Sequence, residues 1–295
     1  MQKIHFFEFS DLNREPITFS SPTDFEGFCL KHGIRAYAFN EAKANEVAAV
    51  CIPETNVVLM KDAESIATSK EVLKKALLSF DFNLQNEKKI SGNSNGHDYV
   101  EIGGIKWATM NIGADSVTDK GLIFQWGDTQ GYTAAQVGTD KMFNWADYKY
   151  TNDGGSAMTK YNSTDGKTVL DVEDDAVTAA WGGSWRMPTK EEFAKLREST
   201  SFAWTNDYEG SGVAGLVLTD KTDISKVLFF PACGSCGGGS INSVGDVGDY
   251  WSSSLFSSRV QSAYILYFNS GGVSWQHGNN RYDGYAVRGV LGRNS

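Results

Sequence analysis

Toward its end, the chain alternates apolar and polar positions with the two-residue period of a β-strand. The first strand of this pattern has two sides, with Tyr264, Leu266 and Phe268 on one and Ala263, Ile265 and Tyr267 on the other. A Ser-Gly-Gly turn at residues 270–272 follows, and Val273 and Trp275 then share a side opposite Ser274 and Gln276. The pattern predicts a hairpin with its Leu266 side toward the core and its Ile265 side toward solvent.

The segment after this hairpin, residues 277–285, carries almost no aliphatic side chain. The C-terminal stretch as a whole is rich in Tyr, Ser, Asn, Gly and His, with occasional Trp and Arg. This is the composition of a paratope, in which rigid rings supply contact area and small polar groups supply hydrogen bonds. Residues 250–290 are therefore predicted to form a display surface. An edge hairpin and a polar loop without a partner is the alternative, because exposed loops are polar by default.

Upstream of this surface the pattern predicts mainly strands. Residues 99–108 form a hairpin with a Gly-Gly turn, and strands are expected at 121–128, 213–219 and 226–230. A helix is expected after Thr189, because Thr189 and Glu192 have the spacing of a capping box, and Phe193 and Leu196 then face the core.

The first part of the chain alternates strand and helix signals. Strands are expected at 3–9, 34–39 and 57–60, and helices at 24–32, 41–49 and 69–80. Residues 1–91 are thus predicted to form a small α/β domain for attachment or oligomerisation, and His5 and His32 are read as surface or packing residues. All eight tryptophans lie at or beyond Trp107, and the polar, turn-rich segment 86–96 separates the two parts. The second domain is placed at 97–295, and the overall class is predicted as α+β.

Composition limits the classes of function. The net charge of −9 argues against nucleic acid as a partner, and no apolar run approaches the 18 residues that suggest a membrane span. The first 15 residues are too polar for a signal peptide, which predicts synthesis in a cytosol. Four cysteines are too few for a disulfide scaffold in a chain of 295 residues.

Five motifs in one order resemble a known family: Gly-Ile-Lys-Trp-Ala at 104–108, Trp-Gly-Asp at 126–128, Trp-Gly-Gly-Ser-Trp-Arg-Met-Pro-Thr at 181–189, Tyr-Trp-Ser-Ser-Ser at 250–254 and Ala-Val-Arg-Gly-Val at 286–290. Together, over about residues 98–292, they resemble the C-type lectin fold in the branch of formylglycine-generating-enzyme-like proteins and the major paralogous domains of gut Bacteroidetes. The C-terminal stretch most resembles the variable proteins of diversity-generating retroelements of Bacteroidetes or their phages. In those systems, adenines in a template repeat are mutagenised and copied into the end of the gene.

This resemblance implies a set of ligand-binding positions. Asparagine codons altered at adenines yield Tyr, Ser, Asp, His, Gly, Ile, Val, Phe and Arg, and residues of this kind recur on the expected solvent side, as does Gly278. The predicted ligand-binding residues are Phe256, Arg259, Val260, Ser262, Ile265, Tyr267, Gly272, Ser274, Gln276, His277, Asn279, Asn280, Asp283 and Tyr285. Gln261 and Gln276 depart from the codon pattern, because an asparagine codon does not become a glutamine codon in this way.

The resemblance implies a non-enzymatic ligand-binding protein, such as a receptor-binding component of a phage tail. Its partner would be a cell-surface protein or glycan, with homo-oligomerisation open, and no cofactor is expected. Burial of Trp185 and Trp251 is expected to hold the scaffold rigid.

Two chemical alternatives stand beside this interpretation. Cys233 and Cys236 form a close pair that fits a formylglycine-generating-type or other cysteine-dependent oxidoreductase if a thiolate is stabilised. A zinc site would need two further ligands, and no second pair has the spacing for it. The acidic run at 171–175 fits either calcium ligation or the first turn of a helix, and the prediction names no metal.

Overall fold

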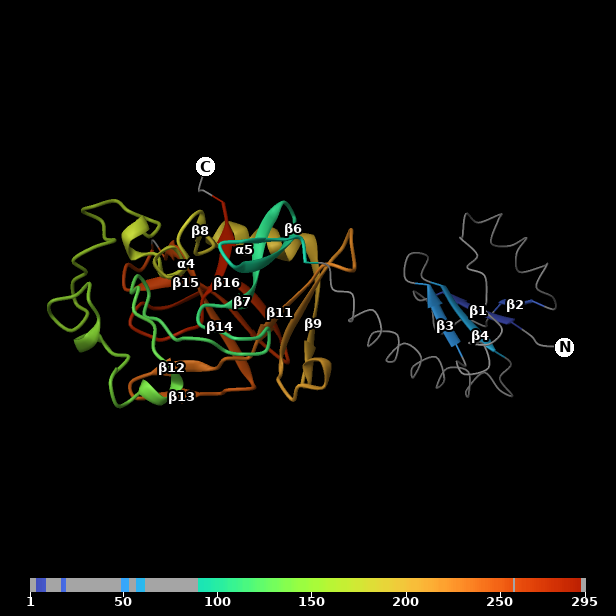
Figure 1. Ribbon diagram of the computed structural model, residues 1–295. Helices are drawn as coiled ribbons and strands as arrows, with labels where there is room; N and C mark the ends of the chain where they lie inside the picture. The colour runs from blue at the N-terminus through green and yellow to red at the C-terminus, as the bar shows by residue number, and fades with distance from the viewer. Residues whose placement is uncertain are drawn as a thin grey trace. The chain divides into compact units, whose positions relative to one another are not determined.

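The computed structural model describes residues 4–8, 17–19, 49–52, 57–61, 90–256 and 258–292, and the chain divides into two compact units, Met1–Glu87 and Lys88–Ser295 (Figure 1). In the first unit, four strands form an antiparallel sheet in the order β2-β1-β4-β3. They are β1 (Ile4–Glu8), β2 (Ile17–Phe19), β3 (Ala49–Ile52) and β4 (Val57–Lys61). The structure does not describe the expected strand at 34–39, residues 24–32, 41–48 and 69–80 of the expected helices, or the side chains of His5 and His32. Ala49, expected at the end of a helix, instead begins β3.

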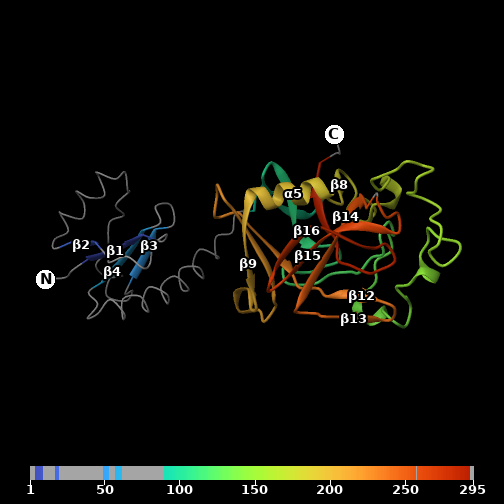
Figure 2. The same ribbon diagram turned by 180° about the vertical axis from the view of Figure 1, so that it is seen from behind.

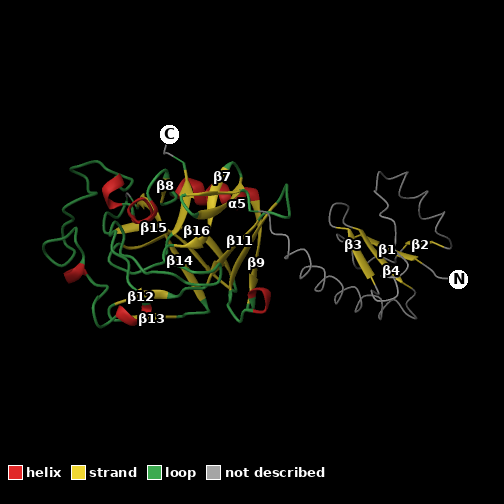
Figure 3. Cartoon of the chain, in the orientation of Figure 1, coloured by secondary structure: helices red, strands yellow, loops and turns green. Residues whose placement is uncertain are grey.

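The second unit contains four sheets (Figure 3). The largest has the order β5-β6-β7-β17-β8, a second has β11-β10-β9, a third has β14-β15-β16, and β12 pairs with β13. The strands are β5 (Gly92–Ser94), β6 (His97–Ile102), β7 (Ile105–Asn111), β8 (Trp185–Arg186), β9 (Thr200–Thr205), β10 (Gly215–Asp220), β11 (Val227–Pro231), β12 (Ser235–Gly237), β13 (Ser240–Asn242), β14 (Val247–Leu255), β15 (Ser262–Asn269), β16 (Gly272–Asn280) and β17 (Arg288–Leu291).

Helix is scarce in the described residues. The two α-helices are α4 (Ala176–Trp181) and α5 (Lys190–Ser199), and single 3-10 turns occur at Ala134–Gln136, Trp145–Asp147, Val172–Asp174 and Tyr208–Gly210. Neither α-helix approaches the length and apolar character that a crossing of the bilayer requires.

The expected α+β class, with a C-type lectin fold preceded by a small α/β domain, is wrong, because the structure is β-rich. An α/β unit needs parallel strands joined by crossover helices. The described strands of the first unit instead pair antiparallel, and β3 and β4 are adjacent strands separated by only four residues. In the second unit, sheets pack mainly against other sheets and long loops, and aromatic side chains fill the space between them.

The helix predicted after Thr189 is confirmed as α5. The Thr189 hydroxyl accepts a hydrogen bond from the Glu192 N–H at 3.3 Å, and the Glu192 carboxylate accepts one from the Thr189 N–H at 2.9 Å. These bonds satisfy two donors that a helix N-terminus leaves open. Phe193 and Leu196 are both buried, so the helix holds its apolar side against the sheet strands of the core. Figure 2 shows α5 beside β14, β15 and β16, with β9 following it.

Two hydrophobic cores lie on opposite sides of the β14-β15-β16 sheet. One contains Ala263 and Ile265 of β15, and the other contains Leu266 and Phe268 of the same strand. Alternate residues of a strand point to opposite faces, so β15 is a central strand buried on both. Trp185 and Trp251 are buried as expected, with exposed fractions of 1% and 0%.

Candidate ligand-binding surface

Strand β16 forms one edge of its sheet and carries many of the predicted ligand-binding residues. Gln276 and His277 are exposed, and so is Arg259 in the loop between β14 and β15. Other predicted positions are half-buried, namely Phe256, Val260, Tyr267, Gly272, Ser274, Asn279, Asn280 and Asp283, together with Gly278. We call the accessible side chains of β16, with Phe256, Arg259 and Tyr267 beside them, the β16 surface.

Three predicted ligand-binding residues lie inside the molecule, and these predictions are wrong. Ile265 is fully buried because both faces of β15 are covered by a core. Tyr285 is buried with its ring centroid 4.6 Å from that of Trp251, in the same core as Ile265. The Ser262 hydroxyl is buried and accepts a hydrogen bond from Arg259 Nε at 2.7 Å.

Aromatic rings anchor the β16 surface. The rings of Tyr267 and His277 lie 5.5 Å apart on adjacent strands, and the Tyr267 hydroxyl accepts a hydrogen bond from Asn269 Nδ2 at 2.8 Å. Next to His277 on the same strand, Gly278 packs against the Phe256 ring, and an added Cβ at 278 would lie 2.6 Å from that ring. Glycine at 278 therefore leaves the space that the Phe256 ring occupies.

A groove of about 430 Å³ lies beside this surface, between α5, β9 and β16. Its lining is more polar than apolar and consists of Ala194, Arg197, Phe202, Val273, Ser274, Trp275 and Gln276. The Phe202 ring is 50% exposed and meets the Trp275 ring edge-on at 6.1 Å. Because Ser274 and Gln276 belong to β16, the groove and the β16 surface share residues.

A buried arginine that the sequence reasoning did not identify ties the surface to the body of the unit. Arg281 is fully buried, and its guanidinium donates hydrogen bonds to the Tyr148 hydroxyl at 2.7 Å and to the carbonyls of Val260 at 2.9 Å, Lys160 at 3.0 Å and Tyr161 at 3.3 Å. The same group lies over the Trp126 ring at 4.7 Å, a cation–π distance. Arg281 thus fixes the loop before β15 and the end of β16 against a distant segment.

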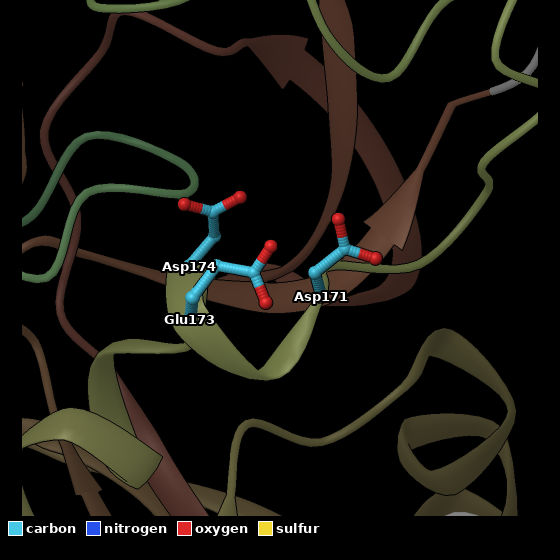
Figure 4. A group of neighbouring side chains, drawn as sticks. All are labelled: Asp171, Glu173 and Asp174. Carbon is cyan, nitrogen blue, oxygen red and sulfur yellow. The ribbon is translucent and has the colours of Figure 1, made fainter.

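The acidic run offers three carboxylates that converge, Asp171, Glu173 and Asp174 (Figure 4). Lys160 Nζ already lies among them, at 2.7 Å from Asp171, 3.2 Å from Glu173 and 2.5 Å from Asp174. Burial opposes ionisation of Asp174, but hydrogen bonds from Lys160, Tyr150, Tyr161 and Lys149 outweigh it and lower the pKa of this carboxyl. An ammonium group occupies the centre that a calcium ion would need, so the residues fit an ion-pair cluster better than a metal site.

The neighbouring Asp175 has a separate structural role. Its carboxylate accepts hydrogen bonds from the N–H of Thr178 at 2.9 Å and from that of Met187 at 2.8 Å. It caps α4, which corresponds to the helix-turn alternative for the acidic run.

The two cysteines of the second unit are buried and unbonded to each other. Burial raises the pKa of the Cys233 thiol to about 11, against hydrogen bonding from Tyr250, and burial with the nearby Asp283 raises that of Cys236 to about 12. The thiolate is the nucleophile in cysteine chemistry, so both groups are held in their unreactive form at neutral pH.

Alkylation tests whether the two thiols are unreactive in the folded protein. We expect Cys233 and Cys236 to stay unmodified when the native chain is treated with iodoacetamide at pH 8 and its peptides are examined by mass spectrometry, because both thiols are buried and protonated. Full modification of both in denaturant is the control. Rapid modification of either one in the native chain would restore the oxidoreductase alternative.

Two carboxyl groups of this stretch, the buried Asp249 and the half-buried Asp283, have raised pKa values. Asp249 has an exposed fraction of 3%, and its Oδ1 has no hydrogen-bond partner in the described part of the chain. Burial, with a smaller contribution from Asp283, raises the pKa of Asp249 to about 7. Burial likewise raises the pKa of Asp283 to about 6, against a hydrogen bond donated by the Tyr285 hydroxyl at 3.3 Å.

The arrangement as a whole offers hydrogen-bonding groups and rings on an edge strand, a polar groove beside it, and a rigid interior. Comparison with models of protein families gives no match, and neither curated proteins nor solved structures give one.

Proposed function

We propose that this chain is a ligand-binding protein whose β16 surface makes the contacts, and that this surface is diversified as in the variable proteins of diversity-generating retroelements. The observation that carries the proposal is the division of residues 250–290. Their accessible polar and aromatic side chains lie mostly on β16 and in the loop between β14 and β15. Ala263, Ile265, Leu266 and Phe268 of β15 instead fill two cores.

This division allows binding to change without loss of the fold. Substitutions at exposed positions usually change the free energy of unfolding by less than about 0.5 kcal/mol, whereas truncation of a buried aromatic residue costs about 3–5 kcal/mol. Diversification restricted to the β16 surface would therefore leave Trp251 and Leu266 in place. Ser262, Ile265 and Tyr285 are excluded from the proposed contacts, because each is buried.

Substitution of three exposed residues tests the binding surface. We expect a variant with alanine at Arg259, Gln276 and His277 to lose binding to intact cells, scored with labelled protein on a panel of gut Bacteroidetes. Its melting temperature should stay within a few degrees of the parent, because all three side chains are exposed and only the Arg259 side chain makes a hydrogen bond to a buried group, the Ser262 hydroxyl.

The matched control carries alanine at Lys120, Ser240 and Asn242, which are exposed outside the surface. It should retain both binding and stability. Equal binding by the two variants would remove the β16 surface from consideration, and a melting temperature lowered by many degrees would show that its residues are structural.

The origin of the diversity has a separate test in DNA. A near-copy of the DNA encoding residues 250–290, differing at adenines and lying beside a reverse transcriptase gene, is expected in the genome that carries this chain. Sequencing related isolates should then show changes at the codons of the β16 surface and none at those of Ile265 or Leu266. Changes spread evenly over buried and accessible codons would contradict diversification of a surface.

A further inference from the structure

The groove between α5, β9 and β16 is lined by a guanidinium group, polar side chains and an exposed aromatic ring. We propose that it binds an acidic sugar residue of a glycan, with Arg197 receiving the carboxylate and Phe202 packing against the sugar ring. This inference rests on the proposed ligand-binding function and names the ligand class for one end of the β16 surface.

Arg197 supplies the charge. It is exposed in the last turn of α5 and lines the groove, and within residues 90–256 and 258–292 its guanidinium has no ion-pair or hydrogen-bond partner. By contrast, Arg186, Arg281 and Arg288, which are buried or half-buried, are engaged in hydrogen bonds; Arg186, for example, binds Glu192 with two hydrogen bonds of 2.7 and 2.6 Å. A planar guanidinium matches a carboxylate with two parallel hydrogen bonds, so the free group at Arg197 favours a carboxylate ligand.

The remaining lining favours a hydroxyl-rich ligand over an apolar one. The groove is open and more polar than apolar, whereas sites for drug-like apolar molecules are lined mainly by hydrophobic side chains. The Ser274 hydroxyl has no partner in the described residues, and the Gln276 amide makes only one long hydrogen bond, of 3.5 Å, to the Lys190 carbonyl. These groups can bind sugar hydroxyls while the half-exposed Phe202 ring covers an apolar sugar face.

The anchoring residues lie outside the segment proposed to vary. Arg197 and Phe202 belong to α5 and β9, whereas Ser274 and Gln276 belong to β16. Variants of this chain would therefore share a preference for an acidic group and differ in what surrounds it. Because the chain carries a net charge of −9, long-range attraction does not favour an anion, and recognition depends on these local contacts.

Calorimetric titration of the full chain with acidic oligosaccharides tests the inference. The probes are a tetramer of galacturonic acid, its methyl ester as the neutral counterpart, a hyaluronan tetrasaccharide and tetraglutamate. We expect at least one acidic saccharide to bind, and the methyl ester to bind at least about tenfold more weakly, as expected for loss of a charge-assisted pair.

Two substitutions and two matched controls complete the design. Arg197→Gln should weaken binding by about tenfold or more and Phe202→Ala by severalfold, whereas Lys195→Gln, an exposed charge on the same helix, and Ile224→Ala, an exposed apolar residue elsewhere, should have no effect. Unchanged melting temperatures would show that Arg197→Gln and Phe202→Ala act on binding.

Several results would overturn the inference: no binding of either acidic saccharide, equal binding of the tetramer and its methyl ester, or no effect of Arg197→Gln. Tighter binding of tetraglutamate than of both saccharides would also overturn it, in favour of an acidic peptide. These outcomes leave the proposed function standing if alanine at Arg259, Gln276 and His277 still abolishes binding to cells. If that variant binds normally, the proposed function itself fails.

Discussion

Replacement of Arg281 with methionine is expected to lower the free energy of unfolding of the second unit by about 3–5 kcal/mol. The substitution removes the donors that satisfy the carbonyls of Lys160, Tyr161 and Val260 and the hydroxyl of Tyr148. Each buried acceptor left without a donor costs about 1–3 kcal/mol, and methionine replaces the length of the side chain but none of its hydrogen bonds.

Denaturant unfolding followed by tryptophan fluorescence measures this effect, because all eight tryptophans lie in the second unit. Arg197→Met is the matched control, since Arg197 is exposed in the same unit, has no hydrogen-bond partner among the described residues and should change stability by less than about 0.5 kcal/mol. A cost below about 1 kcal/mol for Arg281→Met would mean that the interior tolerates loss of these hydrogen bonds and that another contact holds the loop.

Replacement of Asp249 with asparagine is expected to stabilise the protein at pH 8 and to have little effect at pH 4. The pKa of Asp249 is raised to about 7 in the fold, above the value of about 3.9 expected when the chain is unfolded. The native state therefore holds a proton that the unfolded state releases between pH 4 and pH 7. The associated stability is fully present below pH 4 and is lost as the pH rises through 7.

A shift of this size corresponds to about 4 kcal/mol between the two ends of that window. The asparagine variant carries no ionisable group at this position, so its stability should fall less between pH 4 and pH 8 than that of the parent. Thermal melts at both pH values measure the difference. Asp246→Asn, an exposed carboxylate three residues away, is the control and should give parallel curves. If the stability of Asp249→Asn fell between pH 4 and pH 8 by as much as that of the parent, Asp249 would be ionised in the native state at no cost in stability.

Local features of the sequence predicted local structure well. The Ser270-Gly271-Gly272 turn does connect β15 to β16, with Asn269 paired to Gly272. The capping box at Thr189 begins α5, and Trp185 and Trp251 lie in the core. Each of these follows from residues within one turn or strand, or from the size and hydrophobicity of a single side chain.

The errors arose where distant segments decide burial. The two-residue period correctly divided β15 into two sides, but it did not show that both sides are covered, by Trp251 on one and Phe193 on the other. The unbroken apolar run at residues 263–268 was the available signal, because a strand buried on both faces reads as a continuous hydrophobic run. Nothing near Arg281 in the sequence indicates its partners, which lie 21 to 133 residues away.

The close approach of the Phe256 ring to Gly278 has a consequence for any library built on this scaffold. If both codons vary, a bulky side chain at 278 forces the ring at 256 to swing away or be replaced by a smaller group, so the two choices are not independent. Sequenced clones should then show linkage, with large residues at one site accompanying small residues at the other. The usable repertoire is correspondingly smaller than the product of the alternatives allowed at each position.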